Sequence, residues 1–165
     1  MGNSSDKIGW RRGLIAAAFT LIGAAPLAAQ QACREDTVML RGDWGNVRFS
    51  VEIADEPQEQ AIGLMNRESM AFSAGMLFVY PRPQPISFWM RNTLIPLDMV
   101  FIDAQGVVQH IHANAVPLDE TPIPGGDAVL SVLEINGGLA AALGITVGSH
   151  VRHPAHEKYA PVWPC

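Results

Sequence analysis

The segment from Ser87 to Asp103, SFWMRNTLIPLDMVFID, constrains the fold of this chain more than any other. It is an apolar, strand-forming run, and it contains Asn92, Thr93 and Asp98 near its centre. Side chains buried only to fill a core need no hydrogen-bonding groups, because an unpaired buried polar group costs free energy. The segment therefore predicts a buried strand next to polar residues that have a structural or functional role.

Four further motifs accompany this segment. They are GLMNRESM followed by GMLFVY upstream, and NAVP and VLEINGG downstream. With these motifs the chain resembles the exported prokaryotic family called domain of unknown function 192, from about residue 47 to residue 151. The resemblance implies a compact β fold. The family has no assigned activity, so the resemblance implies no chemistry.

The first 29 residues have the composition of a signal peptide. Lys7, Arg11 and Arg12 make a basic start, residues 14–27 form an apolar run, and Ala28-Ala29 supply small residues for cleavage. The run of about 14 residues is shorter than the roughly 20 that span a bilayer as a helix. We expect export to the periplasm or the exterior by the Sec or the twin-arginine route, leaving residues 30–165 as one β-rich domain.

The charge of the chain limits its partners. Asp and Glu number 16 against 11 Lys and Arg, and no basic cluster follows residue 12. Binding to nucleic acid relies on such clusters, so nucleic acid is not an expected partner. We expect a small molecule, a glycan or an envelope protein instead, and a chain that does not span the membrane once processed.

The two cysteines, Cys33 and Cys165, lie at opposite ends of the processed chain. An exported protein with two cysteines most often pairs them, so we predict a disulfide between them. The simplest interpretation is one bond that joins two otherwise loose tails.

Local patterns predict several short elements and one fold class. We expect strands at 47–53, 76–80, 88–91, 97–102, 107–115, 129–135 and 147–152, helices from residue 57 and at 139–143, an extended proline segment at 81–85, a hairpin turn at 103–106 and a loop at 117–127. Short strands at close spacing favour a mostly β domain. We predict a compact antiparallel sandwich or distorted barrel with two short helices.

Asp98 and Glu134 are the carboxylates with the most apolar neighbours. Each must be paired, hydrogen-bonded or neutral. Two such groups are what a glycosidase uses as acid and base. The structural alternative is that each accepts hydrogen bonds from loop backbone or pairs with Arg67 or Arg91. On that alternative we expect Glu134→Gln to destabilise the protein more than Asp98→Asn.

A second group of candidates comprises Arg67, Trp89, Asn92 and Thr93. A Trp that points outward beside Asn and Arg forms a platform for sugars or cations. The alternative is a core Trp with Asn92 in a turn.

His110 and His112 lie two apart on a predicted strand, and so on one face, as weak candidates for a metal site. No third ligand is set by spacing, so we expect no metal. We expect His150, His153 and His156 to be solvated. The leading hypothesis is a binding or accessory module without a cofactor, its cleft near Trp89, Asn92, Asp98 and Glu134. The alternatives are an enzyme that acts on envelope glycans through Asp98 and Glu134, and a metal carrier.

Overall fold

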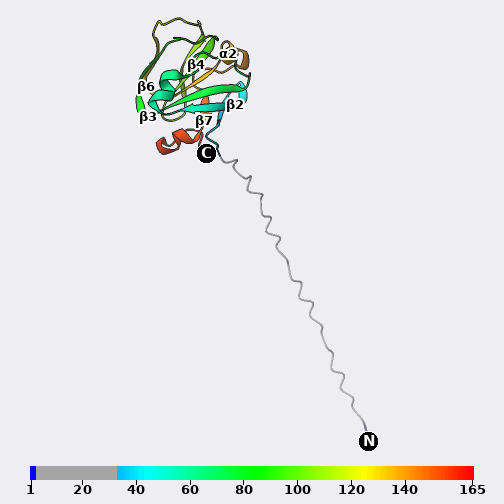
Figure 1. The fold of residues 1–165 in the computed structure, drawn as a ribbon. Coiled ribbons are helices and arrows are strands. Elements are labelled where there is room, and N and C mark those ends of the chain that lie inside the picture. The colour runs from blue at the N-terminus through cyan, green and yellow to red at the C-terminus, as the bar shows by residue number, and fades with distance from the viewer. Residues whose placement is uncertain (3–32) are drawn as a thin grey trace.

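The structure is a computed structural model that describes residues 1–2 and 33–165. Nearly all of the predicted signal peptide therefore lies outside the described residues. The elements are β1 Thr37–Gly42, β2 Gly45–Ala54, α1 Pro57–Ile62, β3 Ala74–Phe88, β4 Leu97–Ile102, β5 Val108–Ala115, β6 Ile123–Asn136, α2 Leu139–Leu143, β7 His150–Arg152 and the 3-10 helix η1 Pro154–Tyr159 (Figure 1).

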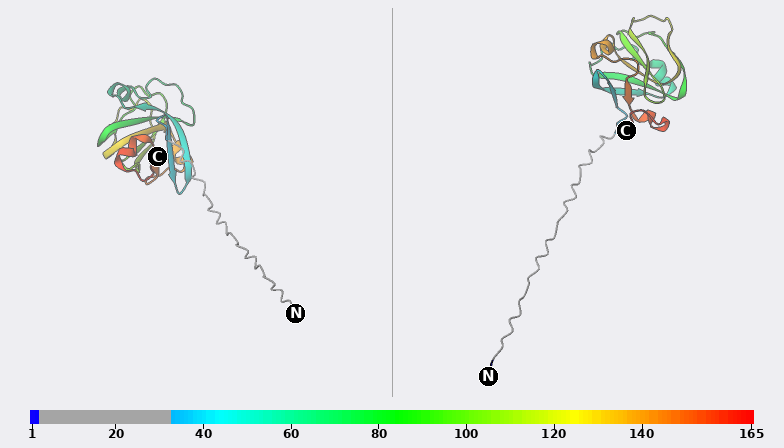
Figure 2. Two further views of the ribbon diagram at one scale, coloured as in Figure 1. Left: turned by 90° about the horizontal axis from the view of Figure 1, so that it is seen from below. Right: turned by 180° about the vertical axis from the view of Figure 1, so that it is seen from behind.

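The strands form a single sheet in the order β5-β4-β6-β3-β2-β1-β7, curled into a half-barrel (Figures 1 and 2). The two outer strands approach each other at one end, where Val107 forms a bridge with His150. The prediction of a mostly β distorted barrel is confirmed. The strand pairs are antiparallel except β2 and β3, which run parallel because the chain crosses over through α1.

Alternate residues of the central strands enter two separate cores. The inner core, on the concave side, contains Val38, Leu40, Phe49, Val51, Leu77, Val100, Ile102, Val108, Leu133, Ile135, Leu139, Ala140, Ile145 and Val151. The outer core contains Ala54, Leu64, Met76, Phe78, Met90, Ile95, Leu97, Met99, Phe101, Ala115, Ile123, Val129 and Val132. Residues 98–102 of β4 therefore alternate between the two cores, which explains why the whole strand is buried.

The proline segment differs from its prediction. Residues 81–85 are extended, as expected, but they belong to the continuous strand β3. The register of β3 against β6 shifts between Val79 and Gln84, and again between Gln84 and Ile86. A proline has no backbone N–H to donate to the hydrogen-bond ladder of a sheet. Pro81, Pro83 and Pro85 lie where the ladder between β3 and β6 is already interrupted.

Several boundaries were not predicted correctly. β6 begins at Ile123, inside the predicted loop, because residues 123–129 pair with residues 84–88 of β3. Residues 89–91 lie after the end of β3, and β7 is shorter than the expected strand. The elements β1 and η1 were missed. By contrast β4 and α2 have the predicted limits, and α2 is closed on each side by a glycine with positive φ, Gly138 and Gly144.

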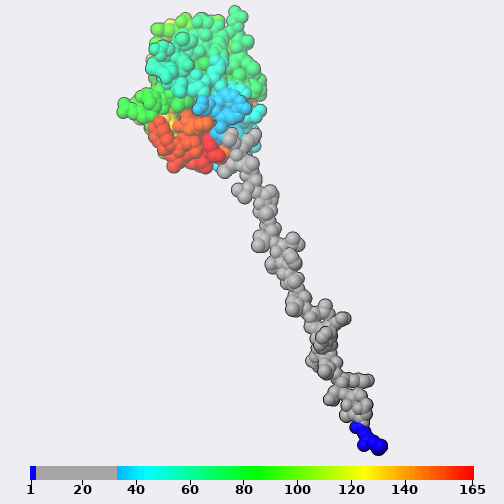
Figure 3. Space-filling model, turned by 60° about the horizontal axis from the view of Figure 1, so that its bottom comes forward, coloured from blue at the N-terminus to red at the C-terminus, as the bar shows by residue number. Residues whose placement is uncertain are grey.

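The predicted disulfide between Cys33 and Cys165 is present, with the two Cα atoms 5.5 Å apart. The C-terminal segment packs against the start of the described domain (Figure 3). Arg152 donates a hydrogen bond of 2.9 Å to the carbonyl of Cys165, and its guanidinium and that of Arg41 lie over the ring of Trp163. The C-terminal tail is thus held by several contacts besides the disulfide.

His153 and His156 correct the expectation that these histidines are solvated, because both are buried. Nε2 of His153 lies 2.9 Å from the carbonyl of Glu35. His156 lies between the carbonyl of Ala104, 3.3 Å from Nδ1, and the hydroxyl of Ser131, 3.1 Å from Nε2. Burial lowers the pKa of each imidazole below its usual value of 6.5. Both rings are therefore neutral at pH 7.

Because the pKa of a buried histidine is lower in the folded protein than in the unfolded chain, acid destabilises the folded protein. The unfolded chain binds a proton at this histidine near pH 6.5, and the folded protein binds it only at lower pH. The contribution of the neutral histidine to the free energy of unfolding is therefore complete above pH 6.5 and is lost as the pH falls. We expect His156→Gln to be less stable than wild type at pH 8, with a difference that shrinks between pH 7 and pH 5. Urea unfolding across this range measures it, and a difference independent of pH would contradict the assignment.

Candidate functional site

The surroundings of Asp98 indicate a structural role. It is fully buried on the inner side of β4, beside the start of α2. Its carboxylate accepts three backbone hydrogen bonds, from Asn114 at 2.6 Å, Gly138 at 2.8 Å and Ala140 at 2.7 Å. These bonds connect β4 to the end of β5 and to the first turn of α2. Asp98 is therefore bonded to backbone, as in the structural alternative, but the donors lie in β5, at the N-cap of α2 and in its first turn rather than only in a loop.

Glu134 lies on the opposite side of the sheet. In the pairing of β4 with β6, Asp98 is opposite Ile135 and Met99 is opposite Glu134. Residues directly opposite in a pair of strands point to the same face, and neighbours along a strand point to different faces. Asp98 thus points towards the inner core and Glu134 towards the outer core. The two carboxylates do not share one groove.

Unlike Asp98, the carboxyl group of Glu134 has no hydrogen-bond or ion-pair partner among the described residues. It is only 4% exposed, and no hydrogen bond or ion pair to its carboxyl group is found in residues 33–165. Arg67 pairs instead with Glu52, and Arg91 with Glu120. Burial alone raises the pKa of Glu134 to about 8. The structural alternative expected bonds from loop backbone or a pair with Arg67 or Arg91, and neither is found for Glu134 among the described residues. The carboxyl group therefore stays largely protonated at neutral pH.

Glu134 lines a small pocket of about 110 Å³, which we call the Glu134 pocket. Its other lining residues come from α1 and the turn after it, from β3 and from the loop that follows β3: Gln60, Ala61, Ile62, Gly63, Leu64, Met65, Phe78, Tyr80, Ser87, Phe88, Trp89 and Thr93. Burial and the nearby charge of Glu134 raise the pKa of Tyr80 to about 12. The pocket is thus a small space lined by one ionisable carboxyl group, a phenol that stays protonated, and further polar side chains of Gln60, Ser87 and Thr93.

Of the predicted site residues, Trp89, Thr93 and Glu134 are brought together in this pocket. Trp89 is 45% exposed, with the guanidinium of Arg91 4.2 Å from its ring centre. Thr93 is buried, and its hydroxyl donates to the carbonyl of Arg91.

The other predicted residues lie elsewhere. Asn92 is an exposed turn residue with φ 52°, and its amide approaches the sulfur of Met65 at 3.9 Å. Arg67 is held on the surface by both oxygens of Glu52, at 2.5 and 2.6 Å. Neither residue lines the Glu134 pocket, and Asp98 lies on the other face of the sheet.

The aromatic residues Phe78, Tyr80 and Phe88 were missed as site residues. Phe78 and Tyr80 alternate along β3 with the spacing that puts both on one face, together with Met76, which is opposite Glu134. That spacing was visible in the predicted strand 76–80. The proximity of these residues to Glu134 was not visible, because Glu134 is 54 positions after Tyr80 and only the pairing of β3 with β6 brings them together.

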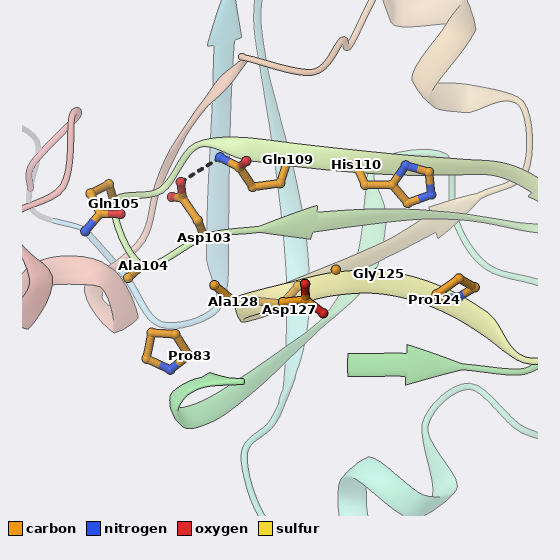
Figure 4. A pocket seen from close by; sticks show the side chains of 12 residues that line it. Pro83, Asp103, Ala104, Gln105, Gln109, His110, Pro124, Gly125, Asp127 and Ala128 are labelled. Carbon is orange, nitrogen blue, oxygen red and sulfur yellow. Dashed lines mark hydrogen bonds between the residues drawn. The ribbon is translucent and has the colours of Figure 1, made fainter. Parts of the chain in front are cut away.

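A larger open cavity of about 810 Å³ lies between the start of β6 and the hairpin that joins β4 to β5 (Figure 4). Asp103 accepts hydrogen bonds there from the side chain of Gln109, at 2.7 Å, and from the backbone of Val107, at 2.9 Å. His110 also lines this cavity, and it stacks on Phe101 with ring centres 5.6 Å apart.

His110 and His112 lie opposite Phe101 and Met99, so both point to the outer face of the sheet, as predicted. Within residues 1–2 and 33–165, no three His, Cys, Asp or Glu side chains are close enough together to hold a metal ion. The structure therefore does not add a third ligand to the two histidines.

The described strands thus form one curled sheet of seven, with the Glu134 pocket on its outer side. The model of the domain of unknown function 192 family, described as Uncharacterized ACR, matches residues 38–153. The chain belongs to this family, as its motifs indicated.

Solved structures that are similar to the chain include the following two. One is a protein of unknown function from Novosphingobium aromaticivorans DSM 12444, with 49% identity and a TM-score of 0.69 over 70% of this chain and 82% of that one. The other is a "putative transcription regulator" from Sinorhizobium meliloti 1021, with 38% identity and a TM-score of 0.69 over 73% of this chain and 94% of that one.

One curated protein, an acetylglutamate kinase from Bifidobacterium animalis subsp. lactis (strain AD011), is 31% identical over 91 residues. The match covers 54% of this chain and 28% of the kinase. The chain thus spans little more than a quarter of that enzyme.

The two carboxylates should respond differently to amide substitution. In Asp98→Asn, one of the three donors would face an amide NH₂ group instead of an oxygen, so we expect a loss of about 1–3 kcal/mol of unfolding free energy. Glu134→Gln removes no hydrogen bond and should cost less. This order reverses the expectation from the sequence. Urea unfolding of both variants at pH 6 tests it, and a larger loss for Glu134→Gln would contradict it.

The pH dependence gives a second test of Glu134. The folded protein keeps a proton on this group up to about pH 8, and the unfolded chain only up to about pH 4.5. Wild type should therefore lose stability relative to Glu134→Gln as the pH rises from 5 to 8, the opposite direction to the histidines. Thermal unfolding of both proteins across this range measures it. A constant difference in melting temperature would mean that the carboxyl group is ionised throughout.

Proposed function

We propose that this protein is an exported ligand-binding module and that the Glu134 pocket is its binding site. The observation that carries the proposal is a carboxyl group, 4% exposed, that has no partner in the described part of the chain. Burial of such a group opposes folding, and residues held at a cost to stability are common at functional sites. A ligand that hydrogen-bonds to Glu134 would remove this cost.

The size of the pocket limits what enters it. Sites for drug-sized ligands measure about 300–1,000 Å³, several times the 110 Å³ found here. The pocket therefore takes one chemical group, and the rest of the ligand lies over the rim. Ile62 and Trp89, which line the pocket, are 61% and 45% exposed and offer an apolar surface there.

Export is supported by the composition of residues 1–29 and by the disulfide between Cys33 and Cys165, since disulfides persist in oxidising compartments. Among the described helices, none has the length and hydropathy needed to cross a bilayer.

Other functions have less support. The acid–base pair of a glycosidase needs two carboxylates about 5–10 Å apart across one groove, whereas Asp98 and Glu134 point to opposite faces of the sheet. A transcription regulator binds DNA through basic clusters, and this chain has an excess of acidic residues.

The indole N–H of Trp89 is a natural reporter of binding, because Trp89 lines the pocket and Trp44 and Trp163 do not. We expect at least one member of a library of small organic cations, amides and alcohols to shift the NMR signal of Trp89 and leave those of Trp44 and Trp163 unchanged. Glu134→Gln should weaken that response. Asp127→Asn, the same chemical change in the larger cavity, should not. A library in which no compound affects Trp89 selectively would contradict the proposal.

A further inference from the structure

The Glu134 pocket combines its carboxyl group with four aromatic side chains, those of Phe78, Tyr80, Phe88 and Trp89. We propose that the pocket binds a methylated ammonium group, such as the trimethylammonium group of a choline-like compound. This inference rests on the proposed function and specifies its ligand.

Two of the aromatic rings meet at a right angle. The rings of Phe78 and Phe88 are perpendicular, at 87°, with centres 4.9 Å apart. Tyr80 and Trp89 are the other two aromatic residues of the lining. Aromatic faces attract cations, and cages of several rings are a known way to bind quaternary ammonium groups. A cage of this kind holds its ligand through ring faces and a carboxylate, and the lining of the Glu134 pocket contains four aromatic residues and one carboxyl group.

No ion pair joins a cation of the described residues to the carboxyl group of Glu134. The two arginines of the family motifs, Arg67 and Arg91, form ion pairs with surface carboxylates instead. An organic cation in the pocket would supply the positive charge that the described chain does not offer to Glu134. Arg91 already lies over the ring of Trp89 at 4.2 Å, so this indole already accepts a cation.

The volume matches the proposed group. A space of 110 Å³ holds about four water-sized groups. A trimethylammonium group consists of one nitrogen and three methyl groups, and it would fill this space with its substituent directed past the exposed Trp89.

Binding should release a proton. Glu134 and Tyr80 are the two titratable residues that line the pocket, and Tyr80 stays neutral because its pKa is about 12. A bound cation stabilises the ionised form of Glu134. Below the pKa of about 8, the affinity should therefore fall by up to tenfold for each unit of pH.

The test compares choline with its neutral carbon isostere, 3,3-dimethylbutan-1-ol, by calorimetry and by the Trp89 NMR signal of the processed protein. At pH 8.5 we expect choline to bind at least tenfold more tightly than the isostere. Glu134→Gln and Trp89→Leu should each weaken choline binding at least tenfold, and Asp127→Asn should leave it unchanged. Because Trp89 is exposed, Trp89→Leu should fold even if Glu134→Gln does not.

Each outcome has a distinct meaning. Equal binding of the isostere and choline, or tighter binding of an amide or alcohol from the library, would overturn the ligand class and leave the pocket as a binding site. Failure of every compound to affect Trp89 would overturn both proposals. Vesicles of phosphatidylcholine, compared with vesicles of phosphatidylglycerol, separate the two sources of the group. Selective sedimentation with phosphatidylcholine supports a lipid headgroup, binding of free choline alone supports a soluble compound, and binding of neither overturns the proposal.

Discussion

The central position of β6 between β3 and β4 is the constraint on which the rest of this structure depends. Leu133 and Ile135 of this strand point into the inner core, and Val132 and Glu134 point to the outer side. Both cores are therefore built on one strand, and any shift of its register by one residue would exchange them. The same register places the carboxyl group of Glu134 beside Met76 and Met99, under the segments that cover the convex face.

Two carboxylates from neighbouring strands have opposite environments in this fold. Asp98 accepts three backbone hydrogen bonds and thereby fastens α2 and the end of β5 to β4. Glu134 is equally withdrawn from water but receives no hydrogen bond within the described residues, and its pKa rises accordingly. The first stabilises the fold. Burial of the second opposes folding, a cost that the proposed ligand would remove, and this difference is why the proposed site is built on Glu134 alone.

Local signals predicted the elements whose limits depend on local chemistry. β4 has a continuous apolar run, and α2 lies between glycines that adopt positive φ. The disulfide followed from the number of cysteines and the expected compartment. The start of β6 and the proline part of β3 were misjudged, because each is a strand only through its pairing with the other. The buried state of His153 and His156 likewise depends on Glu35, Ala104 and Ser131, which are distant in sequence.

For the candidate site, the sequence by itself indicated Arg67, Trp89, Asn92, Thr93, Asp98 and Glu134, since polar or aromatic groups inside apolar runs are buried at a cost unless they have partners or a function. It determined the family as well. Only the tertiary structure decided which of these residues share a pocket, because that depends on strand order and register, and neither is encoded in local periodicity. The sheet sends Asp98 to one face and Glu134 to the other, and it adds Phe78, Tyr80 and Phe88 of β3 to the pocket, 46 to 56 positions before Glu134 in the sequence. A buried carboxyl group becomes a binding site or a structural anchor according to the groups that surround it, and in this protein those groups come from distant parts of the chain.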